Sequence, residues 1–142
     1  MDALLAAAYE LASEQLRAAG TQLQSVKVSP LDRLEAFLLA GFTPEFLSTA
    51  HLRMRIDLWS AALSHPTIAD TERALYGRHR AELEVLLQAI AVPGKSPHVG
   101  RVSDLIMAAR DGIWLDRMRR HDQIATRNAL LACLDHARLT LT

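Results

Sequence analysis

The chain has 142 residues, 50% of them hydrophobic and only 5% aromatic, and its 16 basic side chains balance 16 acidic ones. This length suits one domain, and the aliphatic composition is typical of a helix bundle. The neutral chain lacks the basic excess with which proteins bind nucleic acid. The single cysteine, Cys133, excludes an internal disulfide framework and a cysteine-based zinc site. No apolar run approaches the roughly 20 residues of a membrane span, and the acidic start is no secretory signal, so we expect a cytoplasmic protein without membrane contact.

The sequence predicts six helices and no strand, and hence an all-α single domain over residues 1–142. A hydroxyl residue followed by proline marks three helix starts, because the hydroxyl can cap the helix and proline suits its first turn. These pairs are Ser29-Pro30, Thr43-Pro44 and Ser96-Pro97, and His65-Pro66 marks a fourth boundary. The expected helices span residues 2–19, 30–41, 44–64, 66–91, 98–120 and 122–140.

The first predicted helix has an apolar face from its first residues and no capping residue before it. A chain that begins within a helix is expected to have lost an upstream segment. A natural short product, a deliberate fragment and a misplaced start are all consistent with this pattern.

The fifth predicted helix contains Asp111-Gly112, although glycine in a helix interior is less favourable than alanine by about 1 kcal/mol. Asp-Gly is common in turns, but apolar residues recur at spacings of three and four on both sides of it. We therefore expect an uninterrupted helix in which Gly112 marks the close approach of another backbone. We expect that backbone to belong to a second copy of the chain, and the alternative is a helix of the same chain.

Four segments resemble, in order, the C-terminal regulatory domain of the TetR-family transcription repressors, and within that family the branch of the choline-responsive betaine repressors. The segments are SPLDRLEAFLLAGF (29–42), LWSAALSHP (58–66), RHRAELEVLLQAI (78–90) and ARDGIWLDRM (109–118). Two residues depart from the family pattern. Arg110 stands where an aliphatic residue is usual, and Asp116 stands where an arginine is common.

The resemblance implies an effector-sensing domain that dimerises through its last two helices, while a separate N-terminal helix-turn-helix binds DNA. On this interpretation the helix-turn-helix lies upstream of Met1 and is absent from this chain, so the chain alone is expected not to bind nucleic acid. A small-molecule effector would favour one packing of the helices and so change the spacing of the two DNA-binding units.

Small residues in the last two predicted helices favour a four-helix interface in a homodimer, because they let helix axes approach closely. The predicted interface residues are Ala109, Gly112, Ile113, Arg117, Ala125, Ala129, Ala132, Cys133 and His136.

The same architecture implies an effector pocket inside the bundle of the second to fifth helices. Its predicted lining residues are Phe42, Arg55, Trp59, Leu63, Tyr76, Met107, Asp111 and Trp114. The effector is expected to be a cation or an aromatic compound, because the rings of Trp59 and Trp114 could bind a cation. Asp57 or Asp111 would then supply the counter-charge, and the alternative is that both tryptophans belong only to the core.

The remaining polar residues give no sign of catalysis, a cofactor or a metal. The six histidines lack the spacing of metal ligands, and the serines lack the G-x-S-x-G pattern of a nucleophile. The basic run RMRRH (117–121) lies near a helix C-terminus, where the helix dipole favours positive charge, and the alternative for this run is a contact with nucleic acid. Two alternatives to a regulatory domain remain, a helical protein-interaction adaptor without a ligand pocket and a small helical enzyme.

Overall fold

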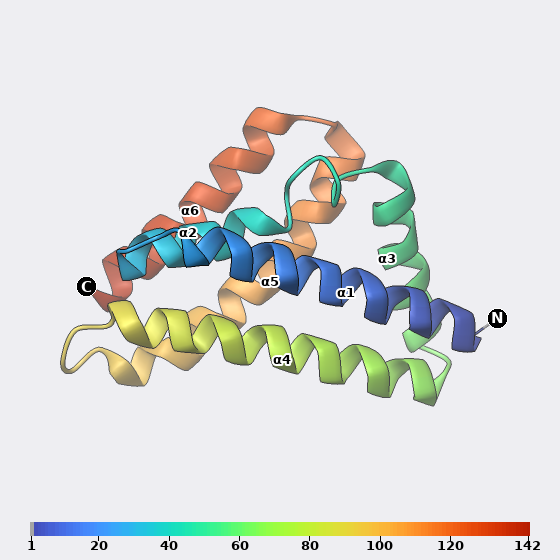
Figure 1. Cartoon of the computed structure of the whole chain (residues 1–142), viewed down its shortest axis with the longest axis horizontal. Helices are drawn as coiled ribbons and strands as arrows, with labels where there is room; N and C mark the ends of the chain where they lie inside the picture. Colours follow the sequence, from blue (N-terminus) through green and yellow to red (C-terminus); the bar gives the residue numbers. More distant parts are fainter. Residues whose placement is uncertain (1) are drawn as a thin grey trace.

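The computed structural model describes residues 2–142, and within them it contains six α-helices, one short 3-10 helix and no strand, which confirms the all-α prediction (Figure 1). The elements are α1 (Asp2–Ser25), α2 (Pro30–Ala40), α3 (Thr49–Ala62), α4 (Pro66–Ile90), η1 (Ser96–His98), α5 (Val99–Arg120) and α6 (Gln123–Leu141). None of the helices in this part of the chain is long and apolar enough to cross a membrane.

Two of the predicted helix starts are confirmed. Ser29 caps α2, because its side chain accepts a hydrogen bond of 3.3 Å from the backbone N–H of Asp32. Helix α4 begins at Pro66, directly after His65 in extended backbone geometry. Both starts follow from local chemistry, since proline suits the first helical turn and restricts the residue before it.

The prediction that a helix starts at Thr43-Pro44 is wrong. The chain makes a single turn there, in which the N–H of Phe46 donates to the carbonyl of Thr43 at 3.0 Å. This turn directs Phe46 into the core, where its side chain is 1% exposed. Helix α3 begins only at Thr49, where the Ser48 hydroxyl accepts a hydrogen bond of 3.2 Å from the backbone of His51.

Two other boundaries differ from the prediction. Ser96 begins the short helix η1 rather than capping α5, and its hydroxyl donates to the side chain of Gln88 at 2.9 Å. Helix α1 continues past residue 19 to Ser25 and passes through Gly20. A Cβ atom added at Gly20 would lie 3.7 Å from the Cβ of Ala40, so this glycine lies where α1 and α2 approach closely.

The core lies where α2, α4, α5 and α6 meet. Its fully buried members include Leu34, Leu38, Leu83, Leu87, Ile106, Ala137 and Leu141. Figure 1 shows α1 and α4 running side by side over this core, and an ion pair of 2.6 Å between Arg17 and Glu82 joins them. The N–H of Val92 donates to the carbonyl of Leu141 at 2.9 Å, which fixes the end of α6 against the α4–α5 connection.

Candidate functional site

A groove of about 430 Å³ lies between the end of α3, the first half of α4 and the middle of α5. We call it the α3–α4 groove. It is open to solvent, and its lining residues are Trp59, Ala62, Leu63, Ala69, Glu72, Arg73, Tyr76 and Asp111. Four of the eight predicted pocket residues are among them, namely Trp59, Leu63, Tyr76 and Asp111.

Two carboxyl groups, two aromatic side chains and Arg73 give the α3–α4 groove its chemistry, and Arg73 is paired with Asp70 at 2.9 Å. Burial raises the pKa of Glu72 from its ordinary value, and the nearby charge of Asp111 raises it further. Burial also raises the pKa of Asp111, although Arg110 and Arg55 act in the opposite direction. Partly desolvated carboxylates beside aromatic rings favour a positively charged group, which relieves the repulsion between the acids and binds to the rings.

Glu72 is a lining residue that the sequence analysis missed. It stands four residues before Tyr76 on α4, and this spacing places both side chains on one face of the helix. The spacing was the available signal. It is weak by itself, because a glutamate and a tyrosine four residues apart are common on solvent-exposed helices.

Four predicted pocket residues do not lie in the α3–α4 groove, and the prediction that all eight share one pocket is corrected. Arg55, Met107 and Trp114 are buried, with exposed fractions of 4%, 5% and 4%. Phe42 lines a different groove, described below. The apolar spacing could identify these residues as inward-facing, but it could not separate a core position from a cavity wall.

Trp114 is fully engaged by its own chain. Its indole N–H donates to the carbonyl of Gly41 at 2.9 Å, and Phe42 stacks on its ring with centroids 5.1 Å apart. The guanidinium carbon of Arg55 lies 3.6 Å from the centre of the same ring. An arginine of the protein therefore already makes the cation–π contact that the sequence analysis assigned to a ligand.

Arg55 is supported by groups that can accept hydrogen bonds or interact with its charge. Its Nε–H donates to Nε2 of His51 at 3.1 Å, and Tyr9 and Asp111 also interact favourably with it. Burial, together with the charge of Arg55, lowers the pKa of His51 to about 4. His51 is therefore neutral at pH 7 and can accept this hydrogen bond.

A second groove, of about 400 Å³, lies at the end of α2 against the start of α6. Its lining residues are Leu39, Phe42, Pro44, Leu47, Arg117, Gln123, Thr126, Arg127 and Leu130. Arg117, which we predicted at the dimer interface, lies here, and its buried Nε atom has no hydrogen-bond partner among the described residues.

Helix α5 continues without interruption through Asp111-Gly112, as predicted. Gly112 is exposed, and a Cβ atom added to it would meet no atom within 4 Å. The alternative that Gly112 packs against a helix of its own chain is therefore wrong. Its missing side chain leaves room on the outer surface of the bundle.

The other predicted interface residues divide between the outer surface and the core. Ala132 and His136 are exposed, whereas Ile113 is only 7% exposed and faces the core. The remaining members are half-buried, namely Ala109, Arg117, Ala125, Ala129 and Cys133. The prediction for Ile113 is corrected, because a position next to Gly112 is turned by about 100° around the helix axis.

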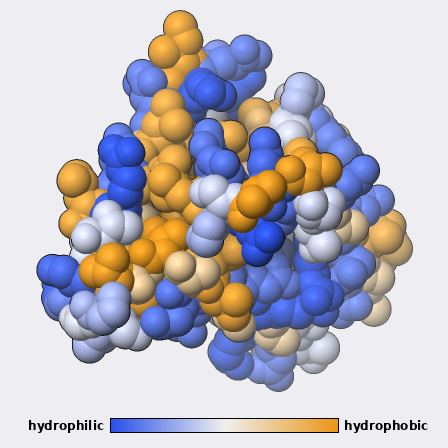
Figure 2. Space-filling view, turned by 60° about the vertical axis from the view of Figure 1, so that its left-hand side comes forward, coloured by the Kyte–Doolittle hydropathy of each residue, from blue (hydrophilic) through white to orange (hydrophobic). Residues whose placement is uncertain are grey.

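Large apolar side chains that the analysis did not select lie on the outside of α5 and α6. Leu105 is 51% exposed, Ile124 is 75% exposed and Leu139 is 80% exposed. Figure 2 shows hydrophobic side chains running down from the top of the molecule, the end at which α5 and α6 meet in Figure 1. Monomeric proteins rarely expose extended apolar patches, so this surface is a candidate for contact with a partner.

Comparison with known proteins identifies a family for most of the chain. Residues 30–142 match the family of the BetI-type transcriptional repressors, in its C-terminal domain. No curated protein matches the chain, and no solved structure matches it. The match begins at the first residue of α2 and includes every helix that lines the two grooves. The chain therefore belongs to the family of BetI-type TetR C-terminal domains, which are domains of transcriptional regulators rather than enzymes.

Proposed function

We propose that this chain is the effector-sensing and dimerisation domain of a TetR-type transcriptional regulator, and that its effector binds in the α3–α4 groove. The observation that supports this site is the pairing of two carboxyl groups, Glu72 and Asp111, with the rings of Trp59 and Tyr76 in one groove. The effector class is an organic cation with an apolar body, since such a compound satisfies both kinds of group.

Helix α5 links the effector groove to the expected dimer surface. Asp111 lines the α3–α4 groove, and the next residue, Gly112, lies exposed on the outside of the same helix. An effector that binds Asp111 favours one position of α5 relative to α3 and α4, and this position sets the geometry of the surface around Gly112. In a homodimer, that geometry would control the spacing of the regulator's two DNA-binding domains.

A pair of isosteric probes tests the proposed groove. Choline carries a positive charge, whereas 3,3-dimethyl-1-butanol has nearly the same shape and no charge. We expect choline to raise the free energy of unfolding by about 2.7 kcal/mol at 100 times its dissociation constant, and the neutral alcohol to have little effect. Thermal unfolding at constant chloride concentration measures this difference.

Matched variants identify the groove as the source of the effect. Asp111→Asn should abolish the stabilisation by choline, because it removes one of the two acids. Asp57→Asn should preserve it, because Asp57 is exposed and does not line the groove. Equal stabilisation by the two probes, or full retention of the effect in Asp111→Asn, would contradict a cation site in this groove.

A further inference from the structure

Arg110 is a buried cation whose guanidinium donates to no oxygen atom of the described residues. Its guanidinium carbon lies 5.1 Å from the centre of the Phe37 ring and 5.3 Å from that of Trp114. Its side chain is 3% exposed, its Nε atom has no hydrogen-bond partner among the described residues, and Nη1 donates only to the sulfur of Met107 at 3.7 Å. A thioether is a weak acceptor. Almost all buried charges in proteins are paired or bound to an ion, because an unpaired one costs several kcal/mol.

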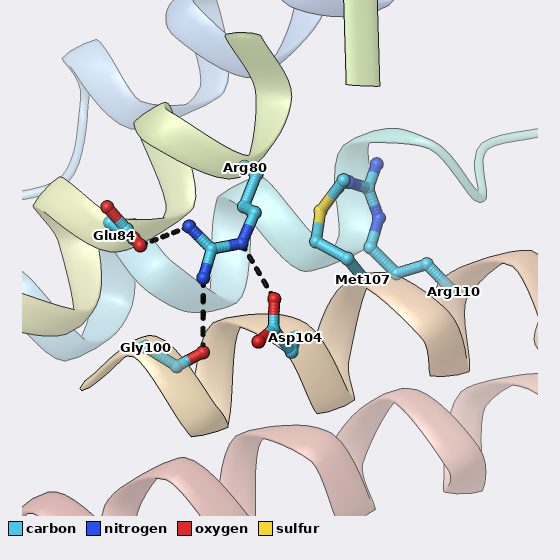
Figure 3. Close-up of polar contacts among 6 residues, drawn as sticks. All are labelled: Arg80, Glu84, Gly100, Asp104, Met107 and Arg110. Carbon is cyan, nitrogen blue, oxygen red and sulfur yellow. Dashed lines mark hydrogen bonds and ion pairs between the residues drawn. The ribbon is translucent and has the colours of Figure 1, made fainter. Parts of the chain in front are cut away.

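A neighbouring arginine shows what a satisfied guanidinium looks like in the same bundle. Figure 3 shows Arg80 with three oxygen partners, while Arg110 lies beside Met107. The Nε–H of Arg80 donates to Asp104 at 2.8 Å, and its other nitrogens donate to Glu84 and to the carbonyl of Gly100. Each guanidinium nitrogen of the partly exposed Arg80 therefore has an oxygen partner, whereas the more deeply buried Arg110 has none among the described residues.

Arg110 lines a small, partly open cavity where α1, α2, α4 and α5 meet. Its lining residues are Leu16, Arg17, Gly20, Gln24, Phe37, Ala40, His79, Glu82 and Arg110. The volume of the cavity is about 10 Å³. Such a cavity accepts one water molecule or one monatomic ion, and it excludes phosphate, sulfate and organic acids.

The side chains around this cavity leave it positively charged. Glu82 is its one carboxylate, and Arg17 already binds that group at 2.6 Å. Asp111 lies next to Arg110 in sequence, but it is shared with the equally buried Arg55. His79 is neutral at pH 7, since burial and the charge of Arg110 lower its pKa to about 3. A water molecule could accept a hydrogen bond here, but it could not balance the charge.

We propose that this cavity binds a monatomic anion of the size of chloride, which accepts a hydrogen bond from the guanidinium of Arg110 and joins α5 to α1, α2 and α4. This site is separate from the α3–α4 groove and does not depend on the effector. Its expected consequence is that the stability of the chain depends specifically on chloride.

Thermal unfolding of the full chain in sodium chloride and in sodium gluconate, at equal ionic strength, tests the proposal. Gluconate is too large for the cavity. Above the dissociation constant, each tenfold increase in chloride should multiply the folded-to-unfolded ratio by about ten. Arg110→Met should remove this dependence, and Arg127→Met should retain it, since Arg127 is an exposed arginine of α6 outside the cavity. Identical unfolding of the natural chain in the two salts would refute the proposal.

A second measurement needs no variant. Crystals of the natural chain soaked in bromide should give an anomalous difference peak within hydrogen-bond distance of the guanidinium of Arg110. Density without anomalous signal at this position would identify a water molecule and overturn the proposal. Bromide bound only at other positions would overturn it as well.

Discussion

Gly41, at the end of α2, is the glycine at which an added methyl group should lower the free energy of unfolding most. A Cβ atom added there would lie 2.8 Å from Cζ2 of Trp114, 3.4 Å from Nη2 of Arg110 and 3.6 Å from Cδ1 of Leu16. Carbon atoms in contact are normally about 3.5–4.0 Å apart, so the indole ring would have to move. The ring cannot move freely, because its N–H donates to the carbonyl of Gly41 itself.

The expected cost follows from two opposing contributions. Overpacking of a core typically costs about 1–3 kcal/mol. Replacing glycine by alanine also lowers the conformational entropy of the unfolded chain. Where the backbone of the folded chain permits alanine, this raises the free energy of unfolding by about 0.4–1 kcal/mol. The φ angle of Gly41 is −80°, so alanine can adopt it. We therefore expect Gly41→Ala to lower the free energy of unfolding by roughly 1–2 kcal/mol, measured by urea denaturation.

Gly77 provides the matched control. It lies within α4, and an added Cβ atom would meet no atom within 4 Å. Gly77→Ala should raise the free energy of unfolding by about 0.5–1 kcal/mol, because alanine is the better helix former. If Gly41→Ala proves as stable as Gly77→Ala, Trp114 is not packed against Gly41, and the arrangement of the two buried arginines around its ring is wrong.

Two further substitutions test the proposed dimer and the observed helix start. Gly112→Leu should convert a dimer into a monomer or an aggregate, as measured by light scattering. Gly77→Leu, also at an open helical position, should keep the mass of the dimer. An unchanged mass for Gly112→Leu would place the contact between the subunits elsewhere. Ser48→Ala should lower the free energy of unfolding by about 1 kcal/mol in urea denaturation, because the Ser48 hydroxyl caps α3. Thr43→Ala should lower it by less. The reverse order would favour the helix start that the sequence predicts.

Local chemistry made several features of the fold predictable. Each depends on residues close together in the chain, such as the Ser29-Pro30 start of α2 and the apolar spacing that carries α5 through Asp111-Gly112. The start of α3 was not predictable in this way, because Thr43-Pro44 and Ser48 are both acceptable caps. The choice depends on where Phe46 is buried, which is a tertiary effect.

The candidate site was predictable only in part, for a related reason. Helical spacing identifies which residues face inward, but a groove exists only where the facing helices leave a space. Trp59 and Trp114 are both inward-facing aromatic residues, yet one lines the α3–α4 groove and the other is enclosed by Arg55 and Phe42. Nothing local to Arg55 indicates that its guanidinium reaches the ring of Trp114, on a helix far along the chain.

The two partly buried histidines predict how stability depends on pH. The pKa of His51 is held at about 4 and that of His79 at about 3, by burial and by nearby arginines. An unfolded histidine has a pKa near 6.5. As the pH falls below 6.5, the unfolded chain therefore takes up protons that the folded chain does not, and the folded state loses stability.

The size of this loss of stability, and the pH range over which it occurs, follow from the same pKa values. Each histidine can lower the free energy of unfolding by at most about 1.4 kcal/mol per pH unit, and by less where solvent screens it. The loss begins near pH 6.5 and continues to about pH 4 for His51 and about pH 3 for His79. Glu72 and Asp111 oppose it at the acidic end, because their raised pKa makes the folded chain the better proton acceptor there.

Replacement of His79 isolates its share of this slope. Urea denaturation between pH 7 and pH 5, in chloride-free buffer, should show a shallower decline for His79→Gln than for the natural chain. Chloride should flatten the slope of the natural chain, since an anion beside Arg110 would raise the pKa of His79 toward its ordinary value. An identical slope in His79→Gln would show that this imidazole is protonated as easily in the folded chain as in the unfolded one.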